Sequence, residues 1–553
     1  MRKDISGCGN AGSGSSLIYC FQYCSVNRKN NSEDRCQKTE NQNSYFHFFR
    51  VIKIKSILPF VLFIYIFILP FNSFSQNWDI SSSQKKIYEE LISLRLPTAK
   101  KLLEEEQKNT TFSKGWNLYL EDLYDFLNII ISQDKNMYDD TEKKIEARVT
   151  NLQKLEKNSP AYAFIYGEIL FHRSMIRFQF NHYIKGGLDF RKGFQLLSEN
   201  EKKFPEWLPN KKSLGLYHII LGTIPDEFQW FNQLLGMEGA RNLGLKEMAL
   251  AMGDASMFHL EAQILYPAIL SFLDIDTKKA VEMTQRVYEK DKRNLLSLFI
   301  TAIILQKEGH NESALRLLEN FQITKNYTAF NYIYYMKGEC QRNKGEYEKS
   351  IVNYKIYLEN AKNKEEKADA FYQIAHCYWL LKDEKNANEI KNKICSEDNS
   401  EYERLIGFCK KGFPNRLLLS SRFYFDGGYY EKAESLLSVS GLKNFSLSAG
   451  LQSRENHLEY LYRLGRIYQK QKQNPKAILQ FRKALQLSPH LKESTTYFVP
   501  YSCFQTGNVF FDLGNIDSAK YYYAKSLTFR NFQYEKSLQY EVKQKLKEIN
   551  QKK

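Results

Sequence analysis

One stretch of the chain constrains the fold more than any other, because its small, aromatic and proline residues are spaced to fit two packed helices. It begins at residue 458 and reads LEYLYRLGRIYQKQKQNPKAILQFRKALQLSPHL. Gly465 and Ala477 are small enough for two antiparallel helices to approach closely, while Phe481 fills the volume between them. Pro489 ends the second helix. The stretch predicts an αα-hairpin, and further hairpins must stack beside it because one hairpin cannot bury its apolar face alone.

The stretch resembles the tetratricopeptide repeat (TPR), a pattern of Leu-Gly, Tyr, Ala, Phe, Ala and Pro at fixed places. The matching residues are Leu461, Leu464, Gly465, Tyr468, Ala477, Phe481, Ala484 and Pro489. Five other segments carry parts of the pattern, and the resemblance implies TPR hairpins over roughly 295–533. Their matching residues are Gly309 and Ala314; Tyr334, Gly338, Gly345, Tyr347 and Tyr354; Ala375, Tyr378 and Ala387; Tyr424, Gly428, Tyr430 and Ala433; and Gly507, Gly514, Ala519 and Tyr523.

The composition favours helices along the whole chain. Only 27 glycines and 12 prolines occur in 553 residues, and apolar residues recur at intervals of three and four. We expect an all-α protein built as a right-handed superhelix, or solenoid, of TPR-like αα-hairpins. Residues 76–290 are predicted to form a helical domain of degenerate hairpins, and residues 291–553 to form the TPR array.

The N-terminal region has the parts of an export signal. The charge-free run SILPFVLFIYIFILPF, residues 56–71, follows Arg50, Lys53 and Lys55 and precedes small residues. Residues 51–75 are therefore predicted to be a signal peptide cleaved before Gln76, with an uncleaved membrane anchor as the alternative. Residues 1–50 are either a disordered leader or an incorrectly assigned start. We expect an exported protein of a bacterial periplasm or cell envelope, touching a membrane only through this segment if it is not cleaved.

Charge and cysteine content exclude some classes of partner and cofactor. The net charge is +16, but basic and acidic residues alternate in stretches such as NAKNKEEKADA, so nucleic-acid binding is not expected. The spacing of Cys20 and Cys24 is a poor match to zinc motifs, and we expect no metal and no cofactor. Four of the nine cysteines lie in the leader. The five that follow it are predicted to be small core residues rather than a disulfide framework: Cys340, Cys377, Cys395, Cys409 and Cys503.

A glycine-rich stretch, GLYHIILGTIPDEFQWFNQLLGMEGARNLG at 215–244, raises the question of catalysis. His218, Asp226 and Glu227 could form a hydrolytic site, but Asp226 after Pro225 is better explained as a helix cap. The stretch has neither the order of a phosphate-binding loop nor the strand such a loop follows. We therefore expect no enzyme activity, and the glycines are interpreted as points of close helix approach.

This stretch also resembles the central part of the eukaryotic inclusion-body-clearance family of TPR proteins. The corresponding residues are Gly215, Gly222, Pro225, Leu235, Gly236, Gly239 and Gly244. The resemblance implies helical scaffolding and names no activity.

The first helix of each TPR hairpin lines the concave surface of such a superhelix, so candidate binding residues can be read from it. They are Tyr335, Arg342, Tyr462, Arg463, Arg466, Lys470, Phe504, Asn508 and Phe511. Arg463, Arg466 and Lys470 share one helix face and suit an acidic peptide or a C-terminal carboxylate. We predict a non-catalytic scaffold that binds a protein or peptide in this groove. The alternatives are a glycan or small-ligand binder of the cell envelope, and an envelope hydrolase.

Overall fold

The computed structural model describes residues 78–108, 114–224, 239–253, 256–396, 403–440, 451–487 and 496–551. Within these ranges the regular structure is helical, without a strand. The predicted leader and signal segment, residues 1–75, lie outside them, as do Pro489, Pro225, Asp226 and Glu227. None of the helices in the described part of the chain is long and apolar enough to cross a membrane.

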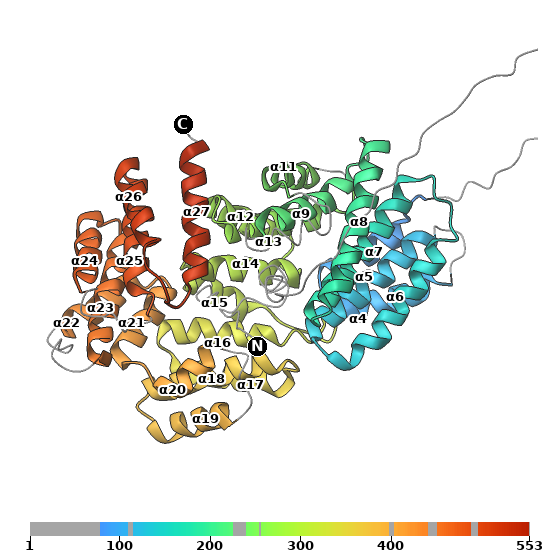
Figure 1. The fold of residues 1–553 in the computed structure, drawn as a ribbon. Coiled ribbons are helices and arrows are strands. Elements are labelled where there is room, and N and C mark those ends of the chain that lie inside the picture. Colours follow the sequence, from blue (N-terminus) through green and yellow to red (C-terminus); the bar gives the residue numbers. More distant parts are fainter. Residues whose placement is uncertain are drawn as a thin grey trace, which may run out of the picture.

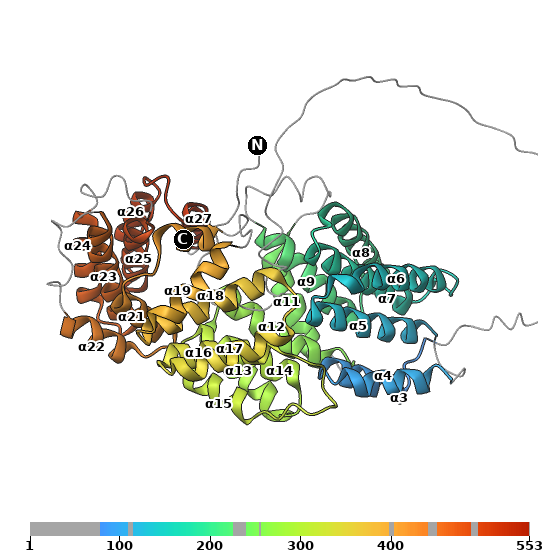
Figure 2. The same cartoon turned by 90° about the horizontal axis from the view of Figure 1, so that it is seen from below.

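Consecutive helices pair as hairpins and curve into one superhelix (Figures 1 and 2). The first pairs are α3 (Ser82–Ile92) with α4 (Leu96–Glu106), α5 (Lys114–Ser132) with α6 (Tyr138–Leu152), α7 (Pro160–Gln179) with α8 (Tyr183–Lys203), α9 (Pro209–Thr223) with α11 (Arg241–Met252), and α12 (His259–Phe272) with α13 (Thr277–Lys290). A short 3₁₀ helix, Lys135–Met137, precedes α6.

The second half continues the same pattern. Its pairs are α14 (Leu295–Lys307) with α15 (Asn311–Asn320), α16 (Tyr332–Lys344) with α17 (Tyr347–Asn360), α18 (Lys364–Leu380) with α19 (Glu384–Ser396), α21 (Arg416–Asp426) with α22 (Tyr430–Ser440), α23 (Leu451–Lys470) with α24 (Asn474–Gln486), and α25 (Phe498–Asp512) with α26 (Ile516–Ser526). The helices α20 (Glu403–Lys411) and α27 (Glu535–Gln551) have no such partner. Each predicted TPR segment is one of these hairpins, so the all-α solenoid is confirmed.

The small residues of the TPR pattern sit where two helices of a hairpin come closest. A Cβ added at Gly465 would lie 2.6 Å from Cδ1 of Phe481, and one at Gly507 would lie 2.6 Å from Cδ1 of Tyr523. Ala477, Ala484, Ala519 and Phe481 are fully buried, and Tyr468 packs at the edge of the core. Only glycine permits this approach, because any larger side chain would overlap the aromatic ring.

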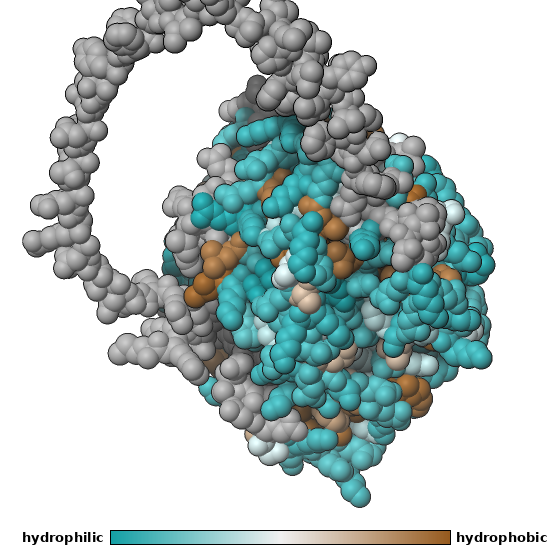
Figure 3. All heavy atoms as spheres, turned by 90° about the vertical axis from the view of Figure 1, so that its right-hand side faces the viewer, coloured by the Kyte–Doolittle hydropathy of each residue, from teal (hydrophilic) through white to brown (hydrophobic). Residues whose placement is uncertain are grey.

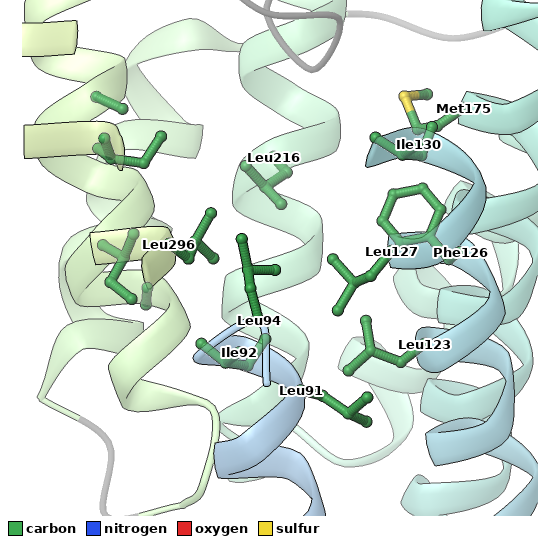
Figure 4. Close-up of a cluster of buried hydrophobic side chains, with 14 of the residues drawn as sticks. Leu91, Ile92, Leu94, Leu123, Phe126, Leu127, Ile130, Met175, Leu216 and Leu296 are labelled. Atoms are coloured by element: carbon green, nitrogen blue, oxygen red, sulfur yellow. The ribbon is translucent and has the colours of Figure 1, made fainter. Parts of the chain in front are cut away.

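The largest apolar core joins the start of the described chain to its middle. Figure 4 shows Leu91, Ile92 and Leu94, at the end of α3, between Leu123 of α5 and Leu296 of α14. Two backbone hydrogen bonds fix this junction: Leu295 N donates to Ser93 O at 3.3 Å, and Thr328 N donates to Leu94 O at 3.1 Å. The N-terminal hairpins and α14 therefore share one core.

The described glycines of the glycine-rich stretch, Gly215, Gly222, Gly239 and Gly244, pack as predicted. The helices α9 and α11 cross so closely that a Cβ at Gly215 would lie 3.0 Å from Gly244 O, and one at Gly222 would lie 2.7 Å from Arg241 N. The interpretation of these glycines as close-approach sites is confirmed. The helix predicted to begin at Pro225 lies outside the described residues.

The cysteine prediction is correct for three residues and wrong for two. Cys340, Cys377 and Cys503 are buried free thiols, as expected for core residues. Cys395 of α19 and Cys409 of α20 form a disulfide instead. The spacing of Cys395 and Cys409 along the sequence does not indicate a disulfide, because the bond depends on α20 packing beside α19.

Candidate partner-binding face

The first helices of the last hairpins form one continuous inner layer. The helix α21 contacts α23, α23 contacts α25, and α25 contacts α27. Figure 1 shows α22 and α24 at the outer edge of the molecule, with α27 lying between the C-terminal hairpins and the middle of the chain. We call the side chains that α21, α23, α25, α27 and the residues just before α25 and α27 turn toward one another the inner face.

Tyrosines and arginines gather on this face around Tyr497, just before α25. The ring centroid of Tyr497 lies 5.9 Å from that of Tyr462, 5.5 Å from that of Tyr501 and 5.3 Å from that of Tyr534. Burial raises the pKa of Tyr497, while the positive charges of Arg463 and Arg422 act to lower it. Aromatic rings beside guanidinium groups are the side chains most enriched at protein interfaces.

The cations of the inner face differ in how they are neutralised. Arg463 Nε donates to Glu459 Oε1 at 2.7 Å, and Arg422 Nε lies 3.5 Å from Asp426 Oδ2. Arg466 and Lys470 form no ion pair with a carboxylate of the residues described by the structure, and Arg466 Nη1 donates instead to the Tyr462 hydroxyl at 3.2 Å. The face therefore presents two positive charges that the described chain leaves without a counter-ion.

Other predicted groove residues are inside the hairpins rather than on a surface. Tyr335 and Arg342 of α16 are 2% and 6% exposed, and Tyr462 and Phe504 are similarly buried. The hydroxyl of Tyr335 donates to Asp369, and Arg342 Nη1 donates to Gln373 Oε1 at 2.5 Å. The structure places these four side chains inside the hairpins and not on an open groove, because adjacent first helices cover them.

Asn508 and Phe511, the remaining predicted residues, are half-buried on α25. Asn508 Oδ1 accepts a hydrogen bond from the Tyr523 hydroxyl at 2.8 Å, and its Nδ2 donates to Gln505 Oε1 at 3.3 Å. Lys545 of α27 lies 5.1 Å from the Phe511 ring centroid. Of the predicted set, the structure therefore brings Tyr462, Arg463, Arg466 and Lys470 together on α23.

Arg422, Tyr497, Tyr501 and Tyr534 were not predicted as site residues. A signal for Arg422 exists in the repeat: it follows Ser421, a buried small residue, as Arg466 follows Gly465. The two arginines thus occupy equivalent positions in successive hairpins. The tyrosines around Tyr497 carry no such signal, since they come from the segment before α25, from α25 itself and from the segment before α27.

A second charged cluster lies in the N-terminal core and is sealed from solvent. Lys212 Nζ lies 2.5 Å from Glu168 Oε2 and 3.1 Å from Glu261 Oε2, and Ser213 Oγ donates to Glu168 Oε1 at 2.6 Å. Burial alone would raise the pKa of Glu168, but Lys212 lowers it below its ordinary value. Because Lys212 and Glu168 are each 2% exposed or less, this cluster links α7, α9 and α12 rather than offering a site.

Of the three candidate hydrolytic residues, His218 lies within the described residues. His218 Nδ1 lies 2.6 Å from Glu247 Oε2 of α11, and both side chains are mostly buried. Asp226 and Glu227 are outside the described residues. Within the described ranges, no group of three or more His, Cys, Asp or Glu residues is arranged to hold a metal ion.

A depression of 460 Å³ lies between α13, α14 and α15. Its lining includes Tyr288, Glu289, Thr301, Arg316 and Asn320. Elsewhere, the face of the N-terminal hairpins in Figure 3 is largely hydrophilic, with apolar side chains in small separate groups.

Comparison with known proteins supports the repeat assignment. A family model described as tetratricopeptide repeat matches residues 458–491. These residues include α24 and most of α23, the hairpin that carries Gly465, Phe481 and Arg466. The chain therefore contains a tetratricopeptide repeat.

The chain is similar to the regulatory protein RapD of Bacillus subtilis, with 28% identity over 193 residues, covering 34% of this chain and 51% of RapD. It thus spans about half the length of this curated relative. Among solved structures, it is similar to human IFIT1 in its dimer with m7Gppp-AAAA, with 14% identity, a TM-score of 0.31 and coverage of 82% of this chain and 97% of that one. It is also similar to NprR in complex with its cognate peptide NprX, with 13% identity, a TM-score of 0.31 and coverage of 74% and 99%.

Proposed function

We propose that this protein is an exported, non-catalytic TPR scaffold that binds a segment of another protein on the inner face of its C-terminal hairpins. The observation that carries the proposal is the cluster of tyrosine and arginine side chains around Tyr497. The residues come from four successive elements of one layer, so a partner lying along the layer would contact several of them at once.

Two features support export. The apolar run at 56–71 has the flanks of a signal peptide. The Cys395–Cys409 disulfide is the second, because disulfides persist in oxidising compartments such as the periplasm and are rare in the cytosol. We propose that the mature protein begins at Gln76 and works in a bacterial cell envelope.

Affinity capture tests the binding proposal. Purified wild-type protein is expected to retain one or a few envelope proteins in amounts comparable to its own. Retention on a polysaccharide column with no protein captured would favour the glycan alternative and overturn the scaffold.

Cell fractionation tests the export proposal separately. We expect the protein in the envelope fraction with its N-terminus at Gln76, read by mass spectrometry. Detection of residues 1–70 in exported protein would contradict cleavage.

The depression between α13 and α15 favours the small-ligand alternative. Arg316 and Glu289 give it both charges, which suits a small polar ligand. Substituting Arg316 by Gln would weaken a ligand bound there and leave protein capture unchanged.

A further inference from the structure

The guanidinium group of Arg466 is held in place while part of it lacks a hydrogen-bond acceptor. The side chain lies 5.4 Å from the ring centroid of Phe425 and donates Nη1 to Tyr462. Its Nε is a buried donor with no acceptor among the described residues. The described neighbours therefore leave part of the hydrogen-bonding capacity of this guanidinium unused, and an acidic group of a partner would supply further acceptors to it.

Lys470 lies one helical turn after Arg466 on the same face of α23. Its side chain reaches solvent, yet burial lowers its pKa and the charge of Arg466 lowers it further. The charges of Glu308 and Asp274, which lie in the middle hairpins, act to raise the pKa of Lys470. Neither carboxylate forms an ion pair with Lys470 in the described structure. Two like charges one turn apart repel each other, and a carboxylate between them would relieve that repulsion.

The acid of α27 that acts on Arg466 does not neutralise the pair. Glu541 of α27 acts on Arg466 electrostatically, but no ion pair joins their side chains in the described structure. Burial raises the pKa of Glu541 to about 7, although Arg466 and a hydrogen bond from Tyr501 act to lower it. Glu459 and Asp426 are engaged with Arg463 and Arg422.

The surroundings of Arg466 and Lys470 suit the carboxylate of an acidic side chain better than the C-terminal carboxylate of a partner. A C-terminal carboxylate needs further donors, such as an asparagine amide, to hold the last residue. Asn508 is the residue of α25 that could supply one, and both ends of its amide are already bonded to Tyr523 and Gln505.

We propose that Arg466 and Lys470 bind the carboxylate of an aspartate or glutamate side chain within the partner's bound segment. This inference rests on the proposed function, and it adds the chemistry of the residue that anchors the partner. The guanidinium supplies planar, paired donors, and the ammonium supplies a second charge.

Selection from a phage library of random 12-residue peptides, fused so that their C-termini are not free, tests the proposal on the full mature chain. We expect enriched peptides to share an Asp or Glu. A labelled synthetic copy with an amidated C-terminus should bind Arg466→Gln and Lys470→Gln roughly tenfold more weakly than wild type, the loss for one charged hydrogen bond. Lys483→Gln, which removes an exposed charge from the outer helix α24, serves as the matched control.

Enriched peptides without an acidic residue, or equal affinity for Arg466→Gln and wild type, would overturn the inference while leaving peptide binding intact. Binding that requires a free C-terminal carboxylate would also overturn it. No enrichment by wild type would count against the proposed function itself. Thermal unfolding of each variant confirms that lost binding does not reflect lost folding, and Arg466→Lys should retain part of the affinity.

Discussion

Single glycines set the distance between paired helices in this protein. In the best-matched repeat, Gly465 faces Phe481 so closely that a methyl group would overlap the ring. We expect Gly465→Ala to lower the free energy of unfolding by about 1–3 kcal/mol, the usual cost of overpacking a core. Denaturant titration measures the change.

Gly407 provides the control, because no atom of the described chain beyond its own helix and neighbours lies within 4 Å of an added Cβ. Gly407→Ala should stabilise α20 by up to about 1 kcal/mol, since alanine favours a helix more than glycine does. Equal effects of the two substitutions would show that Gly465 is not a packing position.

Lys212 is the buried charge on which the N-terminal core depends. Replacing it with Met would leave Glu168 charged and unpaired, and we expect a loss of about 3–5 kcal/mol in unfolding free energy. Lys211→Met, which removes the partly exposed pair with Glu201, should cost less than about 1 kcal/mol. Adding Glu168→Gln to Lys212→Met should recover stability; a further loss would contradict this explanation.

His376 gives the core a pH dependence with a defined sign. Burial among aromatic rings, followed by the charges of Arg422 and Arg342, lowers its pKa from 6.5 to about 3. The unfolded chain therefore binds a proton between pH 6.5 and 3 that the folded chain does not. The stabilising contribution is complete above pH 6.5 and is lost as the pH falls toward 3.

We expect the wild type to lose more unfolding free energy than His376→Phe between pH 6.5 and 4, measured by urea titration at each pH. Parallel curves for the two proteins would show that His376 is protonated in the fold.

At the scale of elements, the disulfide makes α20 an extension of the α18–α19 hairpin. We expect peptide mapping of the exported protein without reduction to show one bond, Cys395–Cys409, and free thiols at Cys340, Cys377 and Cys503. Burial raises the pKa of these three thiols, so iodoacetamide should modify them only after unfolding. Rapid alkylation of Cys395 in the native exported protein would contradict the pairing.

The hairpins could be predicted from the sequence, because their determinants are local. Gly465 and Phe481 belong to one hairpin, and so do Gly215 and Gly244, so spacing along the chain was enough. The exposed residues of the first helices could not be predicted in the same way. Tyr335 and Phe504 occupy suitable positions, but how deeply a neighbouring hairpin covers them depends on the curvature of the whole superhelix.

That curvature has a physical origin in contacts between distant segments. The helix α21 packs against α16 as well as α18, so the intervening helices are displaced from a simple stack. A Cβ at Gly345, after α16, would lie 2.6 Å from the Tyr424 hydroxyl of α21. The repeat pattern makes Arg422 and Arg466 equivalent positions, but that both face the inner layer follows from the packing of α21 and α23.

At the scale of the molecule, several contacts join parts far apart in sequence. Gln133 Nε2 of the N-terminal hairpins donates to Glu366 Oε1 at 2.6 Å, and Asn311 Nδ2 donates to the Tyr429 hydroxyl at 3.0 Å. These contacts hold the hairpins in one arrangement before a partner arrives, which lowers the entropy cost of binding.

Site-specific photocrosslinking in the native envelope tests the binding claim most directly. A benzophenone amino acid at Lys470, exposed on the inner helix α23, is compared with one at Lys483, exposed on the outer helix α24. We expect a discrete protein adduct from position 470 and none from position 483. The same adducts from both positions, adducts from position 483 alone, or no adduct from either would contradict it.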